Sequence, residues 1–141
     1  MSKIGPILLI EDDEDDQLII SQAIRNLGIV NPVQVFNNGQ DALDYLEATP
    51  QTPFLILCDI NMPRLNGIEL KDKINQNEYL RKKAIPFVFL TTTAEEKVVK
   101  KAYRELAQGF CQKASKMVEL ERQLRAIVEY WQSCLHPSSQ V

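Results

Sequence analysis

Short apolar runs, each ended abruptly by polar or charged side chains, are the dominant pattern along this chain. Runs of this length, apolar at successive positions, are typical of strands buried on both faces of a sheet. The pattern predicts five strands, at residues 7–10, 33–36, 54–58, 86–90 and 109–112. Four of these runs end directly on residues that can carry chemistry.

Between the apolar runs, hydrophobic residues recur at the spacing of a single helical face. This periodicity predicts helices over residues 15–27 and 68–75 and a short helix around residues 42–46. A fourth helix is expected to start at a capping box formed by Thr93 and Glu96. Its apolar positions are Val98, Val99, Ala102, Tyr103 and Leu106.

The last helix has the clearest stripe, with Ser115 as its expected cap and Pro137 as its stop. Its apolar positions are Leu120, Leu124, Ile127, Val128, Trp131 and Leu135. Strict alternation of five strands with five helices predicts an α/β fold. Right-handed crossovers then give a parallel sheet that is covered on both faces.

The chain has 141 residues, which suits one domain, and a hydrophobic fraction of 45% that is sufficient for a core. We expect residues 1–136 to form that domain and residues 137–141 to form a disordered tail, with fraying from His136 onward. A net charge of -3 gives no electrostatic case for nucleic acid as a partner. No apolar run has the length of a signal peptide or a membrane span, so we expect a cytoplasmic protein.

The chain has three cysteines, Cys58, Cys111 and Cys134, and one histidine, His136. An odd number of irregularly spaced cysteines argues against a disulfide framework, and the absence of a Cys-x-x-Cys pair argues against zinc. Cys58 and Cys111 lie in apolar strand contexts. We therefore expect them to be small buried hydrophobes in a reducing compartment.

Polar residues follow four of the predicted strands: Glu11 and Asp12, Asp59, Thr91, and Lys113. The carboxyl ends of parallel strands lie at the same edge of an open α/β sheet, where the active crevice is formed. These side chains are therefore expected to share one rim. The next acids have simpler explanations, because Asp13 suits a helix cap and Asp15 and Asp16 suit a solvated first turn.

The combination of residues on this rim has a definite chemistry. Three carboxylates favour a hard divalent cation such as Mg²⁺. Lys113 adds a positive charge and Thr91 a hydroxyl donor, so the groups together suit a phosphoryl group. A carboxylate can then act as the nucleophile and form an aspartyl-phosphate. Asp59 is the best candidate because it stands alone after its strand.

The chain resembles the receiver domain of the two-component response regulator family, in particular its stand-alone, chemotaxis-regulator-like members. The resemblance is carried by Glu11-Asp12, by Asp59-Ile60-Asn61-Met62-Pro63 with Gly67, by Leu90-Thr91, and by Phe110 with Lys113. It implies a flavodoxin-like (βα)5 fold, with a doubly wound parallel five-stranded sheet of strand order 2-1-3-4-5.

The resemblance also implies a metal site and a role for Asp59. Asp59 would be the phosphoacceptor. Asp12 and Asp59 would ligate Mg²⁺ directly, Glu11 would act mostly through a water molecule, and the backbone carbonyl of Asn61 would add a ligand.

The same resemblance assigns the phosphoryl contacts and a switch. Thr91 and Lys113 would bind phosphoryl oxygens, and Phe110 matches the aromatic residue that rotates on phosphorylation. The chain departs from the common family pattern at three positions. Ala114 stands in place of a proline whose preceding peptide bond can be cis, Thr92 in place of a smaller residue, and Phe110 in place of a tyrosine.

The leading hypothesis is a signalling module that catalyses only its own phosphorylation and dephosphorylation. Its phosphoryl donor would be a sensor histidine kinase or a histidine phosphotransfer protein, docked near the first helix and the rim. The segment Leu90 to Thr93 and the Trp-bearing last helix are similar to single-domain regulators that pair with bacterial phytochrome kinases. No DNA-binding domain and no membrane contact is expected.

The output surface is expected on the fourth helix, the last strand and the last helix, where a downstream protein or a second copy of the chain would bind. This surface would carry Lys97, Lys100, Lys101 and Arg104. A solvated helix face is the alternative interpretation of these charges.

Two alternative functions belong to other classes. A Mg²⁺-dependent aspartyl-phosphate phosphatase usually has a second carboxylate two residues after its nucleophile, and here that position is Asn61. A flavodoxin-like carrier of FMN would need a phosphate-binding loop after the first strand, where this chain has acids that repel phosphate.

Overall fold

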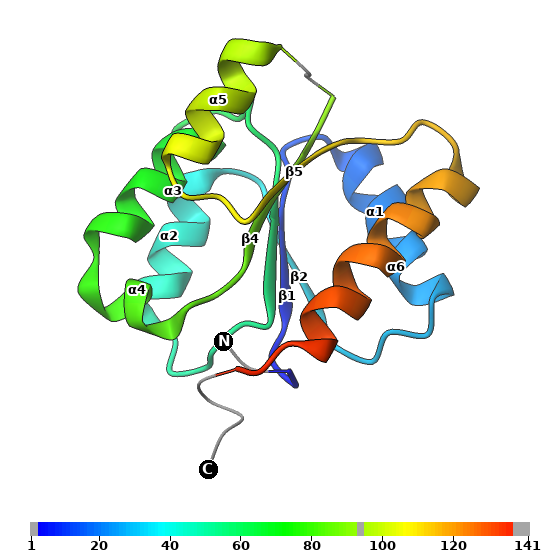
Figure 1. The fold of residues 1–141 in the computed structure, drawn as a ribbon, viewed down its shortest axis with the longest axis horizontal. Helices are drawn as coiled ribbons and strands as arrows, with labels where there is room; N and C mark the ends of the chain where they lie inside the picture. Colours follow the sequence, from blue (N-terminus) through cyan, green and yellow to red (C-terminus); the bar gives the residue numbers. More distant parts are fainter. Residues whose placement is uncertain (1–2, 93–94, 137–141) are drawn as a thin grey trace.

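The computed structural model describes residues 3–92 and 95–136, which form a five-stranded sheet with helices on both faces (Figure 1). All the strand pairs are parallel, and the strand order is β2-β1-β3-β4-β5. The strands are β1 (Ile7–Ile10), β2 (Val33–Phe36), β3 (Leu55–Cys58), β4 (Phe87–Thr91) and β5 (Gly109–Gln112). The expected α/β, flavodoxin-like topology is confirmed.

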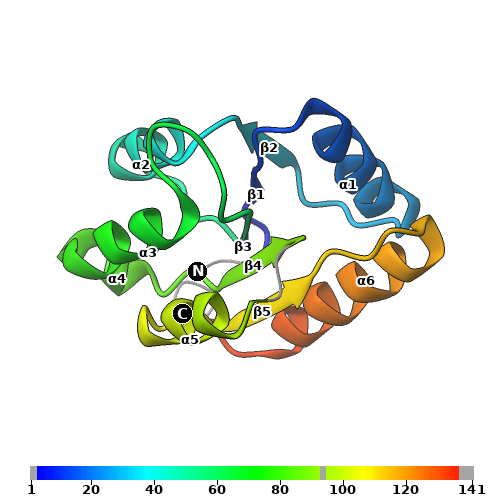
Figure 2. The ribbon, with the colours of Figure 1, turned by 90° about the horizontal axis from the view of Figure 1, so that it is seen from above.

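The helices divide into two layers (Figures 1 and 2). One layer contains α1 (Glu14–Asn26) and α6 (Met117–Ser133), and the other contains α2 (Gly39–Ala48), α3 (Gly67–Gln76), α4 (Glu78–Lys83) and α5 (Glu96–Arg104). None of the helices in the described residues has both the length and the hydrophobicity needed to cross a membrane.

Burial on both faces of the sheet explains the short, continuously apolar runs. In β1, Ile7 and Leu9 pack with the α1–α6 layer, while Leu8 and Ile10 pack with the opposite layer. All four of these side chains are buried. Successive side chains of a strand point to opposite faces, so a central strand needs an apolar residue at each position.

The cap of α1 was predicted correctly. The carboxylate of Asp13 accepts a hydrogen bond from the backbone N–H of Asp16 at 3.0 Å. Its position at the N-cap also places a negative charge at the positive end of the helix dipole. Asp13 is therefore used for capping, directly beside the acidic pair Glu11 and Asp12.

The described residues contain six helices, one more than expected, because α4 was missed. The Asn77 side chain caps α4 by accepting a bond from the Leu80 N–H at 3.0 Å, and Ala84 ends the helix in the left-handed conformation, with φ of 51°. Leu80 is the one buried residue of this six-residue helix. A single buried position produces no periodicity that a sequence reading can detect.

Two expected helix starts were wrong. Helix α6 begins after Lys116 without a side-chain cap, so Ser115 does not cap it, and α5 begins after Glu95, also without one. The predicted capping residue Thr93 lies outside the described residues. Tyr103 and Leu106 are exposed rather than packed, and Leu106 has left the helix with φ of 65°.

At the end of α6, the burial of Leu135 and His136 is the opposite of what was expected from the sequence. The chain becomes extended at Cys134, so Leu135 leaves the helical stripe and is 77% exposed. His136 is instead fully buried, its ring stacks on Phe54 at 5.7 Å, and its Nε2 donates to the Trp131 carbonyl at 2.6 Å. Fraying from His136 is therefore wrong, and the predicted tail, residues 137–141, lies outside the described residues.

All three cysteines are free thiols. Cys58 is buried in β3, as expected, and burial raises the pKa of its thiol well above the usual value. Cys111 is partly buried on the α1–α6 side, and burial raises its pKa too. A raised pKa keeps a thiol protonated and unreactive at neutral pH, which agrees with a packing role.

The substitution His136→Ala is expected to lower the free energy of unfolding by about 2 kcal/mol, since it removes a hydrogen bond and a ring stack. Leu135→Ala is the matched control and should change the free energy of unfolding by less than about 0.5 kcal/mol. Urea denaturation of both variants measures the difference. A larger loss for Leu135→Ala would contradict this description of the α6 end.

Candidate functional site

Three carboxylates meet at the carboxyl edge of the sheet. Oxygen atoms of Glu11, Asp12 and Asp59 all lie within 4.8 Å of one another. Strand pairing brings them together, since β1 and β3 are neighbours and the Asp59 N–H donates to the Ile10 carbonyl at 2.9 Å. The structure thus brings together the acids that were expected to share a rim. Their combined charge favours a hard cation with oxygen ligands.

Glu11 is the buried member of the cluster. The pKa of its carboxyl is raised to about 7, chiefly by burial and also by the nearby charge of Asp59, while the contact with Lys113 acts in the opposite direction. Asp12 is exposed and Asp59 is half-buried. The raised pKa of Glu11 therefore reflects mainly its burial, with a smaller contribution from the negative charge of Asp59.

Lys113 supplies positive charge from the end of β5. Its ammonium donates to Glu11 at 2.6 Å and to Asp16 at 2.8 Å, and its backbone N–H donates to the Thr91 carbonyl at 2.7 Å. Burial alone would lower the pKa of Lys113, but the bonds to Asp16 and Glu11 raise it. The expectation that Asp16 is simply a solvated acid is therefore wrong, because Asp16 is a partner of the rim lysine.

Gln123 fastens the backbone on both sides of Lys113. Its side-chain oxygen accepts from the Ala114 N–H at 3.1 Å, and its side-chain nitrogen donates to the Gln112 carbonyl at 2.6 Å. The described residues contain no cis peptide bond, so the Lys113–Ala114 bond is trans. A proline at position 114 would have no N–H to donate, so alanine permits this clamp from α6.

Thr91 is the last residue of β4, at the carboxyl edge of the sheet. The residue is fully buried, and among the described residues its Oγ1 has no hydrogen-bond partner. A buried hydroxyl usually has one, so an unpartnered group at a site requires an explanation. An acceptor oxygen of a bound group would satisfy it. Thr92 is exposed beside it.

The backbone of Asp59 is approached closely by α3. The Gly67 N–H donates to the Ile60 carbonyl at 2.9 Å, and a Cβ at position 67 would collide with the Asp59 carbonyl and the Phe89 ring. Only glycine allows this approach. The Asp59 carboxylate also accepts from the Ile60 N–H at 2.8 Å, which orients it at the end of β3.

Phe110 and Asn61 lie near the rim in different settings. Phe110 in β5 is half-buried on the α2–α5 side of the sheet, and its ring lies 5.9 Å from the Phe89 ring. Asn61 is exposed in the loop that follows β3. The rotation of Phe110 and a carbonyl ligand from Asn61 remain predictions.

Sequence reasoning missed Asp16 and Gln123. Asp16 is one of six consecutive acids, and its sequence context does not distinguish it from a solvated residue. Gln123 reaches the site from the second turn of α6, with no motif to mark it. Both contacts depend on how α1 and α6 pack against the end of β5, which sequence periodicity does not report.

Comparison with known proteins agrees with this geometry. Residues 7–125 match the response regulator receiver domain family. The probable methanogenesis regulatory protein FilR2 of Methanothrix harundinacea is 32% identical over 129 residues, which is 89% of this chain and 82% of FilR2.

Two solved structures are similar over almost the whole fold. The phosphorylated cyanobacterial phytochrome response regulator RcpA has a TM-score of 0.84 at 28% identity, covering 94% of this chain and 97% of RcpA. The Mn²⁺-bound form of the response regulator Rcp1 has a TM-score of 0.80 at 28% identity, covering 93% of this chain and 97% of Rcp1. A response regulator Rcp1 from Synechocystis is also among the sequence relatives. With its strand order, its acidic cluster and its family match, this chain belongs to the response regulator receiver domains of two-component signalling.

Proposed function

We propose that this protein is a single-domain response regulator that accepts a phosphoryl group on Asp59. The observation that carries the proposal is the cluster of Glu11, Asp12 and Asp59, whose oxygens lie within 4.8 Å of one another. The unpartnered Thr91 hydroxyl and the Lys113 ammonium stand at the ends of the two adjoining strands. This arrangement suits a carboxylate that forms an aspartyl-phosphate.

The donor set fits Mg²⁺, because carboxylate oxygens are the ligands that this ion prefers. Asp12 and Asp59 would ligate it directly, Glu11 through a water molecule, and Asn61 through its backbone carbonyl. Binding of Mn²⁺ by Rcp1, a relative of the same fold, supports this assignment. When bound, the ion would neutralise negative charge on the oxygens of the transferred group.

The phosphoryl step is a displacement at phosphorus. A carboxylate oxygen of Asp59 forms the new O–P bond while the N–P bond of a phosphohistidine breaks, and the histidine nitrogen keeps the electron pair. The Thr91 hydroxyl would donate to one phosphoryl oxygen. Lys113 would donate to another, exchanging part of its contact with Glu11 and Asp16 for the new charge.

A switch would follow from the same contacts. Movement of Thr91 toward the phosphoryl group would leave space that the half-buried Phe110 ring can fill. Reversing a two-state equilibrium needs about 5.5 kcal/mol of differential affinity. Two charge-assisted hydrogen bonds supply roughly 1.5–3 kcal/mol each, and completing the burial of Phe110 adds part of the roughly 1.5–3 kcal/mol that full ring burial provides.

The partners proposed for this chain are a sensor histidine kinase or histidine phosphotransfer protein as donor, acting in the cytoplasm, and a downstream protein as target. The proposed output surface consists of α5, β5 and α6, through which a homodimer would also form. Its α5 part presents the exposed cations Lys97, Lys100, Lys101 and Arg104. Lys100 is paired with Glu96 at 2.9 Å, so this surface is cationic with local neutralisation.

Incubation with acetyl phosphate and Mg²⁺ is expected to add a phosphoryl group to the wild-type chain, because Asp59 is the nucleophile. Asp59→Asn should remain unmodified, and intact-mass spectrometry measures both. Asp15→Asn, an exposed acid on α1, is the charge-matched control and should be modified like the wild type. Equal modification of Asp59→Asn would exclude Asp59 as the acceptor, and sustained turnover of an organic phosphate would favour a phosphatase.

Without metal, Asp59→Asn is expected to raise the free energy of unfolding by on the order of 1 kcal/mol, because it relieves repulsion among the three carboxylates. Saturating Mg²⁺ should stabilise the wild type by about 2.7 kcal/mol at a hundredfold excess over its Kd, and Asp59→Asn much less. Thermal denaturation in EDTA and in Mg²⁺ measures both effects. Identical responses of the two proteins to Mg²⁺ would refute the proposed ligand set.

A phosphoryl mimic such as beryllofluoride is expected to shift the NMR signals of Thr91, Phe110 and α5. Thr91→Val keeps the branched shape but lacks the hydroxyl, so it should bind the mimic while losing most of the shift at Phe110. Unchanged signals at Phe110 and α5 in the saturated wild-type protein would eliminate the proposed switch.

A further inference from the structure

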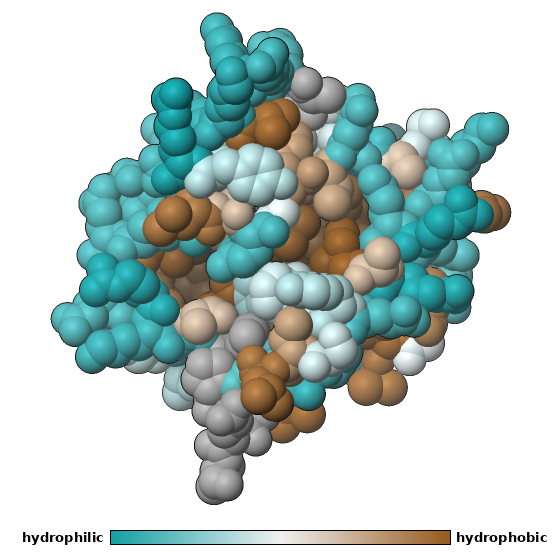
Figure 3. All heavy atoms as spheres, viewed as in Figure 1, coloured by the Kyte–Doolittle hydropathy of each residue, from teal (hydrophilic) through white to brown (hydrophobic). Residues whose placement is uncertain are grey.

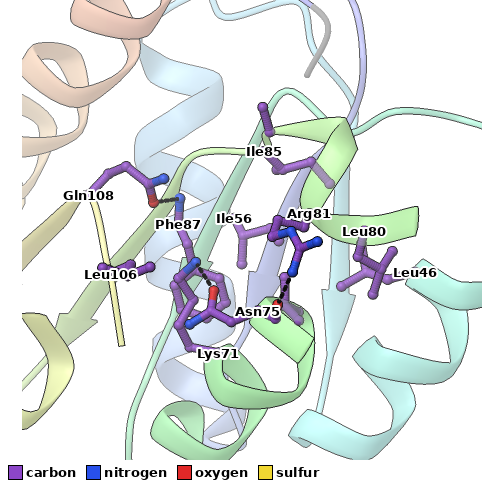
Figure 4. Close-up of a pocket in the computed structure, with 12 residues that line it drawn as sticks. Leu46, Ile56, Lys71, Asn75, Leu80, Arg81, Ile85, Phe87, Leu106 and Gln108 are labelled. Atoms are coloured by element: carbon purple, nitrogen blue, oxygen red, sulfur yellow. Dashed lines mark hydrogen bonds between the residues drawn. The ribbon is translucent and has the colours of Figure 1, made fainter. Parts of the chain in front are cut away.

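A recess lies at the amino ends of the strands, at the edge of the sheet opposite the acidic rim. Its volume is about 400 Å³, and it is enclosed by α3, α4 and the segment that leads into β5 (Figure 4). In the space-filling view, hydrophobic surface is visible in a hollow on the α4 side, framed by hydrophilic side chains (Figure 3). Cavities of this size are in the range that small molecules occupy.

The recess is lined mainly by apolar side chains, with Lys71, Asn75, Arg81 and Gln108 as its polar residues. Its apolar part includes Ile56, Ile74, Leu80, Ile85 and Phe87. Among the described residues that line it, two are cations, Lys71 and Arg81, and none is an acid. A largely apolar cavity whose charged lining residues are both cations is complementary to a molecule with an apolar body and one anionic group.

Lys71 is the unusual member, because a lysine is rarely buried to this extent. It is 6% exposed, and its ammonium donates to the Asn75 side-chain oxygen at 2.8 Å and lies 5.7 Å from the centre of the Phe87 ring. An ammonium has three N–H donors. In the described part of the chain, Asn75 is the hydrogen-bond acceptor that it contacts.

Asn75 is itself held in place by its neighbours. Its side-chain nitrogen donates to the Glu105 backbone carbonyl at 2.7 Å and to the Glu105 carboxylate at 3.4 Å, and its backbone carbonyl accepts from Arg81 at 3.3 Å. Burial lowers the pKa of Lys71, and only the nearby Glu105 opposes this effect. The charge on Lys71 is therefore incompletely compensated, and an anion placed beside it would stabilise it.

We propose that this recess binds a small amphiphilic carboxylate. Its carboxylate would accept hydrogen bonds from Lys71, with Arg81 at the opening, and its apolar body would pack among Ile74, Leu80 and Phe87. The alternative is a purely structural role, in which the lysine stem covers the Phe87 ring and nothing binds. This ligand site is separate from the acidic rim, so the proposal does not depend on phosphorylation of Asp59.

The test titrates the full chain with three probes of equal chain length: octanoate, octanol and octylammonium. Octanoate is expected to bind saturably, to shift the backbone amide NMR signals of Leu80, Phe87 and Gln108, and to bind at least about tenfold more tightly than octanol, because a charge-assisted hydrogen bond has this magnitude. Octylammonium should bind more weakly still, since it would place a second cation beside Lys71.

The substitution Lys71→Met keeps the stem and removes the charge, so the variant should lose most of its preference for octanoate over octanol. Lys73→Met, an exposed lysine on the same helix, is the matched control and should leave the preference unchanged. Arg81→Met, at an exposed position, gives a second variant whose folding is not at risk, and it should weaken octanoate binding by a smaller factor. The proposal is overturned by equal affinities for octanoate and octanol, by no saturable binding, or by shifts that map outside the recess.

Discussion

The ion pair between Lys113 and Glu11 joins the carboxyl ends of β1 and β5, the first and last strands along the chain. It sets the balance of charge at the rim. The two residues are 102 positions apart in the chain, and their charged atoms lie 2.6 Å apart in a largely buried setting. Removing Lys113 would leave the buried Glu11 carboxylate without its cationic partner, whereas removing Glu11 would leave Lys113 paired with Asp16 alone. The orientation of α1 also depends on it, because the same ammonium contacts Asp16.

This ion pair leaves the rim only partly neutralised. Glu11 has a raised pKa even with Lys113 bound, and Asp12 and Asp59 add charge that Lys113 does not contact directly. The proposed Mg²⁺ ion would balance part of this negative charge, and the proposed phosphoryl group would be bound by Lys113 and the Thr91 hydroxyl. At the amino ends of the strands, the imbalance of charge has the opposite sign, because a buried cation, Lys71, lines an apolar recess.

Much of the fold was predictable from sequence because a central parallel strand is buried on both faces. The apolar runs located β1, β2 and β5 to the residue and β3 and β4 to within one residue, and the strand order came from the family resemblance. The sequence predictions failed where a segment of the chain buries only one or two side chains. Helix α4 buries only Leu80, and the exchange between Leu135 and His136 depends on one change of backbone direction at Cys134.

For the site, the sequence by itself determined which residues stand at the strand ends, because the position of Asp59 or Thr91 follows from where an apolar run stops. It also marked Asp13 as a cap, since capping depends on local backbone geometry. Only the tertiary structure decided that Asp16 contacts Lys113, that Gln123 clamps the backbone around it, and that Lys71 lies in a recess. Those contacts join elements far apart in the chain, and their geometry is determined by how the helices pack against the sheet, which a local pattern does not encode.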